Sequence, residues 1–294
     1  MGTRPSQPAE VSVGGYVRDA VVGRGAFGTV YAARAPGGDR VALKVFREGR
    51  SVWAAREIAI LRRLRAADTP ATCHMLDAGD ADGRAYITFP LLGCTAYEHL
   101  VQGKLNGLTP RLLHLVTHAV VTALAALHGL GIAHVDVKPE NVLLSADRLS
   151  AWLADFGLAQ DSPLGRVTYA QSRYYRAPEV VLGAGADELV DVWSLGCMTA
   201  ELATGRVLFH SRDEGELYAR HKALPLPREL VARSTRSDTF LAQPALGRSP
   251  LPAGDDLVSQ FVRSCLVADP HQRPSVVQLA THPYASWCPA TPAI

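Results

Sequence analysis

The chain has 294 residues, of which 48% are hydrophobic and 20% charged, and its formal net charge is +2. This mixture is typical of a globular protein, because a disordered chain has fewer apolar residues and a larger net charge. The small charge excess gives no indication of nucleic-acid or membrane-surface binding. No run of about 18 uninterrupted apolar residues is present, so we expect no transmembrane segment.

The cysteines and the N-terminus bear on the location of the protein. The five cysteines show no C-x-x-C spacing, which argues against a disulfide framework or zinc ribbon and favours buried free thiols in a reducing compartment. The N-terminus lacks a hydrophobic signal core, so we expect an intracellular protein, in the cytoplasm, the nucleus or both. Residues 1–6 match the loose myristoylation pattern, with a frayed tail as the alternative.

The first third of the chain is predicted to be mostly strands. Residues 1–13 are polar and contain two prolines, which predicts a flexible leader. Short β-branched or aromatic runs, separated by glycine-rich turns, then predict strands at 17–22, 29–33 and 41–46. A helix at 52–64 follows from its apolar spacing, and two more strands are expected near Met75 and at 86–89. Residues 91–94 are predicted to be a connector.

Beyond the connector the pattern becomes helical. Thr109 and Pro110 form an N-cap followed by proline at the first helical position, and apolar residues then recur at three- and four-residue steps up to Gly129. Residues 189–202 are apolar nearly all round, which predicts a buried central helix. The sequence therefore predicts a small β-rich lobe and a larger helical lobe joined near 90–94, and clefts between lobes are favoured ligand sites.

Two motifs in the β-rich half are suited to phosphate. Residues 23–30 read G-x-G-x-x-G-x-V, and glycines let the backbone approach phosphate oxygens. A dinucleotide-binding loop and an ordinary hairpin are the alternatives, but a strand-like run follows where dinucleotide binding requires a helix. Lys44, in V-A-L-K, is at hairpin distance from this loop, and Glu57 is the candidate acid to hold it. Alternatively, Glu57 makes a surface pair with a neighbouring arginine.

A third motif, H-V-D-V-K-P-E-N at residues 134–141, places several polar groups in one loop. Asp136 is suited to accept a hydroxyl proton. Asn141 and Asp155, the latter in D-F-G, supply the hard oxygen ligands that Mg²⁺ prefers. Each piece alone is compatible with ordinary turn chemistry, whereas their order along the chain points to one site.

With Ala177-Pro178-Glu179 added, this order of motifs resembles that of a eukaryotic-type protein kinase from about residue 16 to residue 284. The resemblance implies an α+β, bilobal kinase fold, with a β-rich N-lobe containing one main helix and a larger, mostly helical C-lobe. The kinase domain is expected at 14–286, with the N-lobe at about 14–90, the hinge at about 90–94, the C-lobe at about 95–286 and a tail at 287–294.

The resemblance also implies the cofactors ATP and Mg²⁺ and a role for each motif residue. Lys44, held by Glu57, would neutralise phosphates, Lys138 would contact the γ-phosphate and Asp136 would accept the hydroxyl proton. Asn141 and Asp155 would hold Mg²⁺. The residues expected to bind ATP are Gly23, Arg24, Gly25, Ala26, Phe27, Gly28, Val30, Ala42, Lys44, Phe89, Pro90, Leu92 and Leu143. Those expected to be structural are Asp191, which would anchor the catalytic loop, and the pair Glu179 and Arg273.

Residues 171–179 resemble the CMGC group, most closely its dual-specificity tyrosine-regulated and homeodomain-interacting kinases. Tyr169 falls where those kinases phosphorylate themselves, and Arg173 and Arg176 fall where they bind the phosphate. The alternative is an unmodified tyrosine in a mobile loop. The resemblance implies a protein substrate with a serine or threonine acceptor, with a proline after it as the weaker inference. We also expect a monomer, because little of the sequence lies outside the kinase lobes, and no nucleic-acid partner, because the net charge is small.

The chain departs from the usual kinase pattern at three places. Val135 replaces the arginine that usually precedes the catalytic Asp, Pro90 offers no N–H in the hinge, and the region 208–257 is short for the group. The alternatives to an active kinase are a pseudokinase scaffold that binds nucleotide or partners, a small-molecule kinase of related fold and a dinucleotide-binding module.

Overall fold

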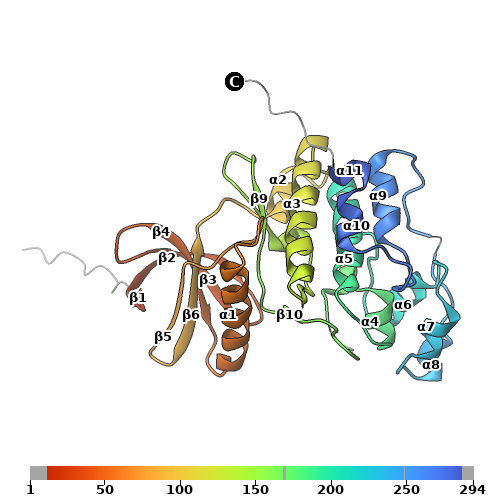
Figure 1. Ribbon diagram of the computed structural model, residues 1–294, viewed down its shortest axis with the longest axis horizontal. Helices are drawn as coiled ribbons and strands as arrows, with labels where there is room; N and C mark the ends of the chain where they lie inside the picture. The colour runs from red at the N-terminus through yellow and green to blue at the C-terminus, as the bar shows by residue number, and fades with distance from the viewer. Residues whose placement is uncertain (1–11, 168–169, 248, 287–294) are drawn as a thin grey trace, which may run out of the picture. The chain divides into compact units, whose positions relative to one another are not determined.

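The computed structural model describes residues 12–167, 170–247 and 249–286 (Figure 1). Within these residues the chain forms two compact units, which we call the N-terminal unit (12–68 and 73–92) and the C-terminal unit (69–72 and 93–286). The predicted α+β class is confirmed, with a β-rich first unit and a larger, mostly helical second unit.

The N-terminal unit contains an antiparallel sheet and one helix. The strands lie in the order β1 (Ser12–Val13), β2 (Tyr16–Arg24), β3 (Gly28–Arg34), β4 (Arg40–Phe46), β6 (Arg84–Pro90) and β5 (Asp77–Ala81). Helix α1 (Ser51–Ala66) packs beside the sheet near β6 (Figure 1). A buried cluster on the sheet consists of Val13, Tyr16, Ala33, Val41, Leu43, Val45 and Tyr86.

Two predictions for this unit are wrong in detail. Ser12 and Val13, assigned above to a flexible leader, pair with Val17 and Tyr16 as β1. The strand expected near Met75 begins instead at Asp77 and reads Asp-Ala-Gly-Asp-Ala, which has no β-branched residue. Its pairing with β6 across a tight turn decides its conformation, because a partner strand outweighs weak intrinsic β propensity.

The C-terminal unit is built around two long helices. Helices α3 (Pro110–Gly129) and α5 (Leu189–Thr204) pack together, with α9 (Leu257–Cys265), α10 (Val276–Ala280) and α11 (Pro283–Ser286) beside them (Figure 1). The remaining helices are α2 (Ala96–Gln102), α4 (Pro178–Leu182), α6 (Glu214–His221), α7 (Arg228–Ala232) and α8 (Asp238–Leu241). The short strand pairs are β7 (Ile132–Ala133) with β10 (Gln160–Asp161) and β8 (Val142–Leu144) with β9 (Ala151–Leu153).

Helix α3 follows the sequence prediction closely. Thr109 is its N-cap, and the Thr109 hydroxyl accepts a hydrogen bond from the Leu112 N–H, as expected for a threonine before proline. In the described part of the chain, α3 alone is long and apolar enough to cross a membrane, but most of its apolar side chains are buried in the core. The high apolar content of α3 is therefore explained by its burial at the centre of the C-terminal unit.

Candidate active site

The predicted nucleotide-binding residues of the N-terminal unit share one face of its sheet. Val30 on β3 lies opposite Gly23 on β2 and opposite Lys44 on β4. Ala42, two residues before Lys44, lies opposite Phe89 on β6. Because side chains that lie directly opposite each other on paired strands point to the same face, this register places five of the predicted residues together.

Lys44 and Glu57 form the predicted ion pair. The Lys44 Nζ atom lies 2.6 Å from Glu57 Oε1 and 2.8 Å from Oε2, and the side chains are 11% and 1% exposed. Glu57 is on the inner face of α1, so the pair joins that helix to β4. Such a buried pair fixes the direction of the ammonium group, because leaving either charge unpaired there is costly.

The glycine loop between β2 and β3 is sterically constrained at one glycine. A Cβ atom on Gly28 would lie 2.3 Å from the Val45 carbonyl oxygen, so only glycine allows β3 and β4 to pair at this point. A Cβ on Gly23 or Gly25 would meet no atom closer than 3.7 Å. The protein itself therefore does not require glycine at Gly23 and Gly25, which agrees with a loop whose backbone approaches a phosphate.

The tip of the glycine loop is attached to neighbouring elements of the same unit. The Phe27 ring packs on the Trp53 ring of α1 with centroids 5.0 Å apart. The Arg47 N–H donates to the Phe27 carbonyl at 2.9 Å, and the Arg47 guanidinium donates to the Gly25 carbonyl at 3.0 Å. Arg24 and Ala26, also predicted to bind nucleotide, are exposed beside these anchored residues.

In the C-terminal unit, Asp191 anchors the loop that holds Asp136, as predicted. The Asp191 carboxylate accepts backbone N–H bonds from His134 at 2.7 Å and from Val135 at 2.8 Å, and its Oδ2 atom also lies 3.0 Å from the His128 ring. Val135 has a φ of +69°. This left-handed conformation is unfavourable for a β-branched residue, and the two hydrogen bonds from the backbone to the Asp191 carboxylate stabilise it.

The Asp136 carboxylate is surrounded by hydrogen-bond donors. Its Oδ1 atom accepts from the Ser172 hydroxyl at 2.7 Å and from the Ser172 N–H at 3.2 Å. Its Oδ2 atom accepts from Lys138 Nζ at 2.6 Å and from Asn141 Nδ2 at 3.1 Å. Lys138 also donates to the Ser172 hydroxyl at 2.8 Å. The side chain of Asp136 is thus held in one orientation by charge-assisted bonds.

Sequence reasoning did not identify Ser172 as a member of this site. Ser172 is separated from Asp136 by 36 residues, and a serine between Gln171 and Arg173 has no distinctive pattern of its own. The only available signal was its position in the segment that resembles CMGC kinases.

Asn141 and Asp155 fit a magnesium ion. The Asn141 Nδ2 atom donates to the Asp136 backbone carbonyl at 2.8 Å. This bond fixes the orientation of the side-chain amide and leaves its Oδ1 atom as the group that can bind a cation. The Ala154 N–H bonds to the Asn141 carbonyl at 2.8 Å, which places the exposed Asp155 residue next to Asn141. Two oxygen ligands from the protein suit Mg²⁺, which retains waters and substrate phosphates in its shell. The described residues contain no group of three His, Cys, Asp or Glu side chains that suits another metal.

The remaining predicted nucleotide-binding residues are divided between the two units. Phe89 and Pro90 end β6, and Leu92 follows them as the last residue of the N-terminal unit; all three are half-buried. Leu143 is the central residue of β8 in the C-terminal unit and lies opposite Trp152. The predicted nucleotide-binding residues thus form two groups, one in the N-terminal unit and one in the C-terminal unit.

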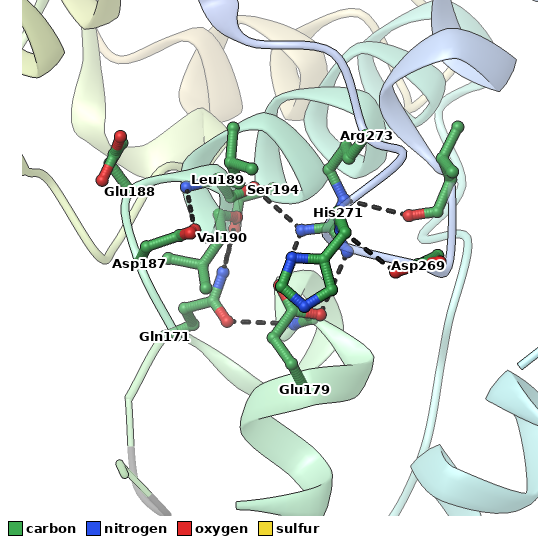
Figure 2. Close-up of polar contacts among 12 residues, drawn as sticks. Gln171, Glu179, Asp187, Glu188, Leu189, Val190, Ser194, Asp269, His271 and Arg273 are labelled. Carbon is green, nitrogen blue, oxygen red and sulfur yellow. Dashed lines mark hydrogen bonds and ion pairs between the residues drawn. The ribbon is translucent and has the colours of Figure 1, made fainter. Parts of the chain in front are cut away.

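The segment before α4 is fixed by Gln171, which is 5% exposed and has a φ of +62°. Its Nε2 atom donates to the Val190 carbonyl and to the Ser194 hydroxyl (Figure 2). The Nε2 atom also donates to the Tyr175 carbonyl, while the Oε1 atom accepts from the Ala177 N–H. These bonds attach the segment to α5.

The two predicted phosphate-binding arginines have different surroundings. Arg173 is exposed, and its guanidinium donates to the Arg212 carbonyl. The Arg176 side chain is 4% exposed and bonds to the Glu214 carboxylate and to the carbonyls of Ala170 and Gln171. Tyr169, the predicted site of modification, lies outside the described residues.

One buried ion pair and one buried hydrogen bond lie in the same part of the C-terminal unit. Arg273 forms the predicted bidentate pair with Glu179, at 2.6 and 3.0 Å (Figure 2). The Tyr175 hydroxyl donates to Glu201 on α5 at 2.6 Å. Burial raises the pKa of the Glu201 carboxyl, and the Glu140 carboxylate nearby raises that pKa further. Glu201 was not singled out from the sequence.

Comparison with known proteins places these features in a family. The sequence model of the protein kinase domain matches residues 16–285. The chain is 32% identical to human dual specificity tyrosine-phosphorylation-regulated kinase 3 over 312 residues, covering 90% of this chain and 53% of that protein. It is 33% identical to human dual specificity tyrosine-phosphorylation-regulated kinase 4 over 289 residues, covering 89% and 55%. The chain therefore spans about half the length of these curated relatives.

A solved structure agrees with the fold. The crystal structure of a kinase domain superposes with a TM-score of 0.83, covering 95% of this chain and 98% of that one, at 24% sequence identity.

Proposed function

We propose that this chain, which belongs to the protein kinase family, transfers the γ-phosphoryl group of ATP to serine or threonine hydroxyls of proteins. The observation that carries the proposal is the Asp136 carboxylate, held by Ser172, Lys138 and Asn141 at 2.6–3.2 Å. A carboxylate fixed in this way can orient an incoming hydroxyl and accept its proton.

Each polar group of the site has a defined task in this proposal. When bound, ATP with Mg²⁺ supplies the phosphoryl group and neutralises part of its charge. Lys44, oriented by Glu57, contacts the phosphates from the N-terminal unit. Asn141 and Asp155 hold the cation. Lys138, which already contacts both Asp136 and Ser172, stabilises negative charge on the transferred group.

A proline directly after the acceptor fits the backbone at Gln171. The Gln171 carbonyl accepts a bond from Arg176 Nη2 at 2.9 Å, so this oxygen is turned to the protein and is not offered to a substrate N–H. Ser172, the next residue, contacts Asp136, so Gln171 lies beside the place where the acceptor is oriented. Proline has no backbone N–H, so a proline at this position leaves no hydrogen-bond donor without an acceptor.

Self-phosphorylation of Tyr169 completes the proposal. The curated relatives are named dual specificity tyrosine-phosphorylation-regulated kinases, and Tyr169 lies three residues before Ser172, a direct neighbour of Asp136. The exposed Arg173 guanidinium provides a charge near the modified residue in sequence.

Mass spectrometry of protein made in bacteria tests this function. Trypsin should release residues 167–173, and we expect phosphate on Tyr169 in the wild type and none in Asp136→Asn. A generic protein substrate with labelled ATP measures transfer in trans. A wild type that binds ATP but transfers phosphate neither to itself nor to any substrate refutes the proposal and leaves the nucleotide-binding scaffold.

A further inference from the structure

The face of the N-terminal sheet opposite to Lys44 carries a cleft. Val45, the residue after Lys44, lies opposite Thr29 on β3 and Tyr86 on β6, so these three side chains point to that face. The cleft has a volume of about 240 Å³ and lies among β2, β3, the end of β4 and the start of β6. Its polar lining residues, which define what we call the arginine cleft, are Arg18, Thr29, Tyr31, Arg47, Glu48 and Arg84.

Three arginines from separate segments line the arginine cleft, together with one carboxylate. The Arg18 guanidinium lies over the Tyr31 ring, 4.9 Å from its centroid, whereas Arg47 and Arg84 are exposed. Among the residues that the structure describes, no carboxylate forms an ion pair with Arg47 or Arg84. With Glu48 included, the lining carries three positive charges and one negative charge, a net +2. Like charges in one cleft repel one another, and a bound anion relieves this repulsion.

A phosphomonoester matches this lining better than a carboxylate does. The planar arginine fork binds phosphate oxygens through two parallel hydrogen bonds. A phosphorylated serine or threonine carries roughly −1.5 to −2 charges at pH 7, which balances the net charge of the lining, whereas a carboxylate carries only one. The Thr29 hydroxyl adds a further donor, and the half-buried Tyr31 offers ring surface to the carbon atoms of the ligand.

Arg47 connects the arginine cleft to the glycine loop. Its Nη2 atom donates to the Gly25 carbonyl at 3.0 Å, and its backbone N–H donates to the Phe27 carbonyl at 2.9 Å. The guanidinium is planar and has five N–H donors, so an anion bound to its other donors also restricts the direction of Nη2. A ligand in the cleft thereby holds the Gly25 carbonyl in place.

We infer that the arginine cleft is a binding site for a phosphorylated serine or threonine side chain of a protein, and that Arg47 couples its occupation to the position of the glycine loop. The binding site goes beyond the proposed function, because it requires neither nucleotide nor phosphoryl transfer. The coupling rests on the proposed function, because it assumes that the glycine loop approaches the phosphates of ATP. Bound phosphopeptide should then strengthen nucleotide binding, and nucleotide should strengthen phosphopeptide binding by the same factor.

The probe is a fluorescein-labelled Ala-Ala-phosphoserine-Ala-Ala peptide, whose binding is followed by fluorescence anisotropy. The full chain is dephosphorylated first, so that no phosphate of its own competes for the cleft. We expect the wild type to bind this peptide at least roughly tenfold more tightly than the serine peptide, and Arg84→Gln to weaken binding roughly tenfold. Inorganic phosphate, added as a competitor, should bind more weakly than the phosphopeptide.

Two further variants locate the binding. Arg40→Gln is the matched control, because Arg40 is an exposed arginine at the opposite end of β4 from Arg47 and does not line the cleft. It should leave the dissociation constant unchanged. Lys44→Met removes the ammonium group on the other face of the sheet and should also leave it unchanged, which separates the cleft from the nucleotide site.

The coupling is measured with the non-hydrolysable analogue AMP-PNP and Mg²⁺. In the wild type we expect the analogue to tighten phosphopeptide binding roughly fivefold, and Arg47→Gln should abolish this effect. The affinity for AMP-PNP is measured in the same series, with and without the phosphopeptide, and should change by the same factor.

The outcomes separate the inference from the proposed function. Equal affinity for the two peptides, an unchanged affinity in Arg84→Gln, an equal loss in Arg40→Gln, or inorganic phosphate that binds as tightly as the phosphopeptide overturns the phosphopeptide site. AMP-PNP that binds without changing phosphopeptide affinity overturns the coupling through Arg47. A chain that binds no nucleotide refutes the proposed function and the coupling, while selective phosphopeptide binding lost in Arg84→Gln would still support the site.

Discussion

The buried pair between Glu179 and Arg273 offers the sharpest stability prediction. Arg273 donates to both oxygens of Glu179, and also to the carbonyls of Leu189 and Val267 at 2.9 Å each, while its guanidinium packs on the Trp193 ring. Both side chains are at most 1% exposed. Removing one partner from such a pair typically costs about 3–5 kcal/mol, because the remaining charge stays buried.

The two single substitutions should differ in a defined direction. In Glu179→Gln, Arg273 keeps two backbone carbonyls and an aromatic ring, so we expect the lower cost, about 3 kcal/mol. In Arg273→Met the Glu179 carboxylate loses both of its bonds to the guanidinium, so we expect the higher cost, about 5 kcal/mol. At about 2–4 °C for each kcal/mol in a domain of this size, Glu179→Gln should lower Tm by roughly 6–12 °C.

A double-mutant cycle completes the experiment. Glu179→Gln combined with Arg273→Met removes both charges, so the double variant should be more stable than Arg273→Met alone. Unfolding is followed by near-UV circular dichroism, to which the buried Trp193 contributes. Glu216→Gln alters only the i,i+4 pairs with Arg212 and Arg220, which are exposed or partly exposed, so it should change Tm far less. Additive costs in the cycle, or a loss below about 1 kcal/mol in both single variants, would refute the reasoning.

Three further predictions concern activity and pH. Lys44→Met should lower kcat/KM for ATP roughly a hundredfold or more, measured by phosphoryl transfer to a generic substrate, and a near-normal rate would remove Lys44 from the site. Trp53→Ala, which removes the ring that packs on Phe27, should raise KM for ATP roughly two- to tenfold; an unchanged KM would mean that this contact does not position the glycine loop. Burial lowers the pKa of His221 to about 3. Since the folded-state pKa lies below the unfolded value, His221 should reduce stability by about 1.4 kcal/mol per pH unit as the pH falls from about 6 to 4, where the unfolded chain binds the proton and the folded one does not. His221→Leu should remove that part of the slope in urea unfolding at several pH values, and equal slopes for variant and wild type would contradict the prediction.

Local patterns were sufficient for several parts of the molecule. The Thr109 cap, the apolar spacing of α3 and the nearly uniform hydrophobicity of α5 each depend on residues close together in the chain, so period and capping chemistry predict them. The kinase motifs are also local, and their order predicted the Lys44–Glu57 and Glu179–Arg273 pairs that the structure contains.

Other features depend on where distant segments meet. Strand β5 has a sequence with weak strand propensity and exists because β6 pairs with it. Ser172 reaches Asp136 across 36 residues, and Glu214 reaches Arg176 across 38. A serine or a glutamate in a polar segment has no periodic or motif signal that reveals such partners.

The sequence by itself therefore determined the family, the order of the elements and the residues suited to phosphate, magnesium and proton transfer. Only the tertiary structure decided which other side chains hold these phosphate-, magnesium- and proton-binding residues in place. Side chains such as Ser172, Glu201 and Glu214 act through partners that come from other segments, and those contacts form only when the segments pack together. Hydrogen bonds and ion pairs act over about 3 Å, so sequence separation carries little information about them.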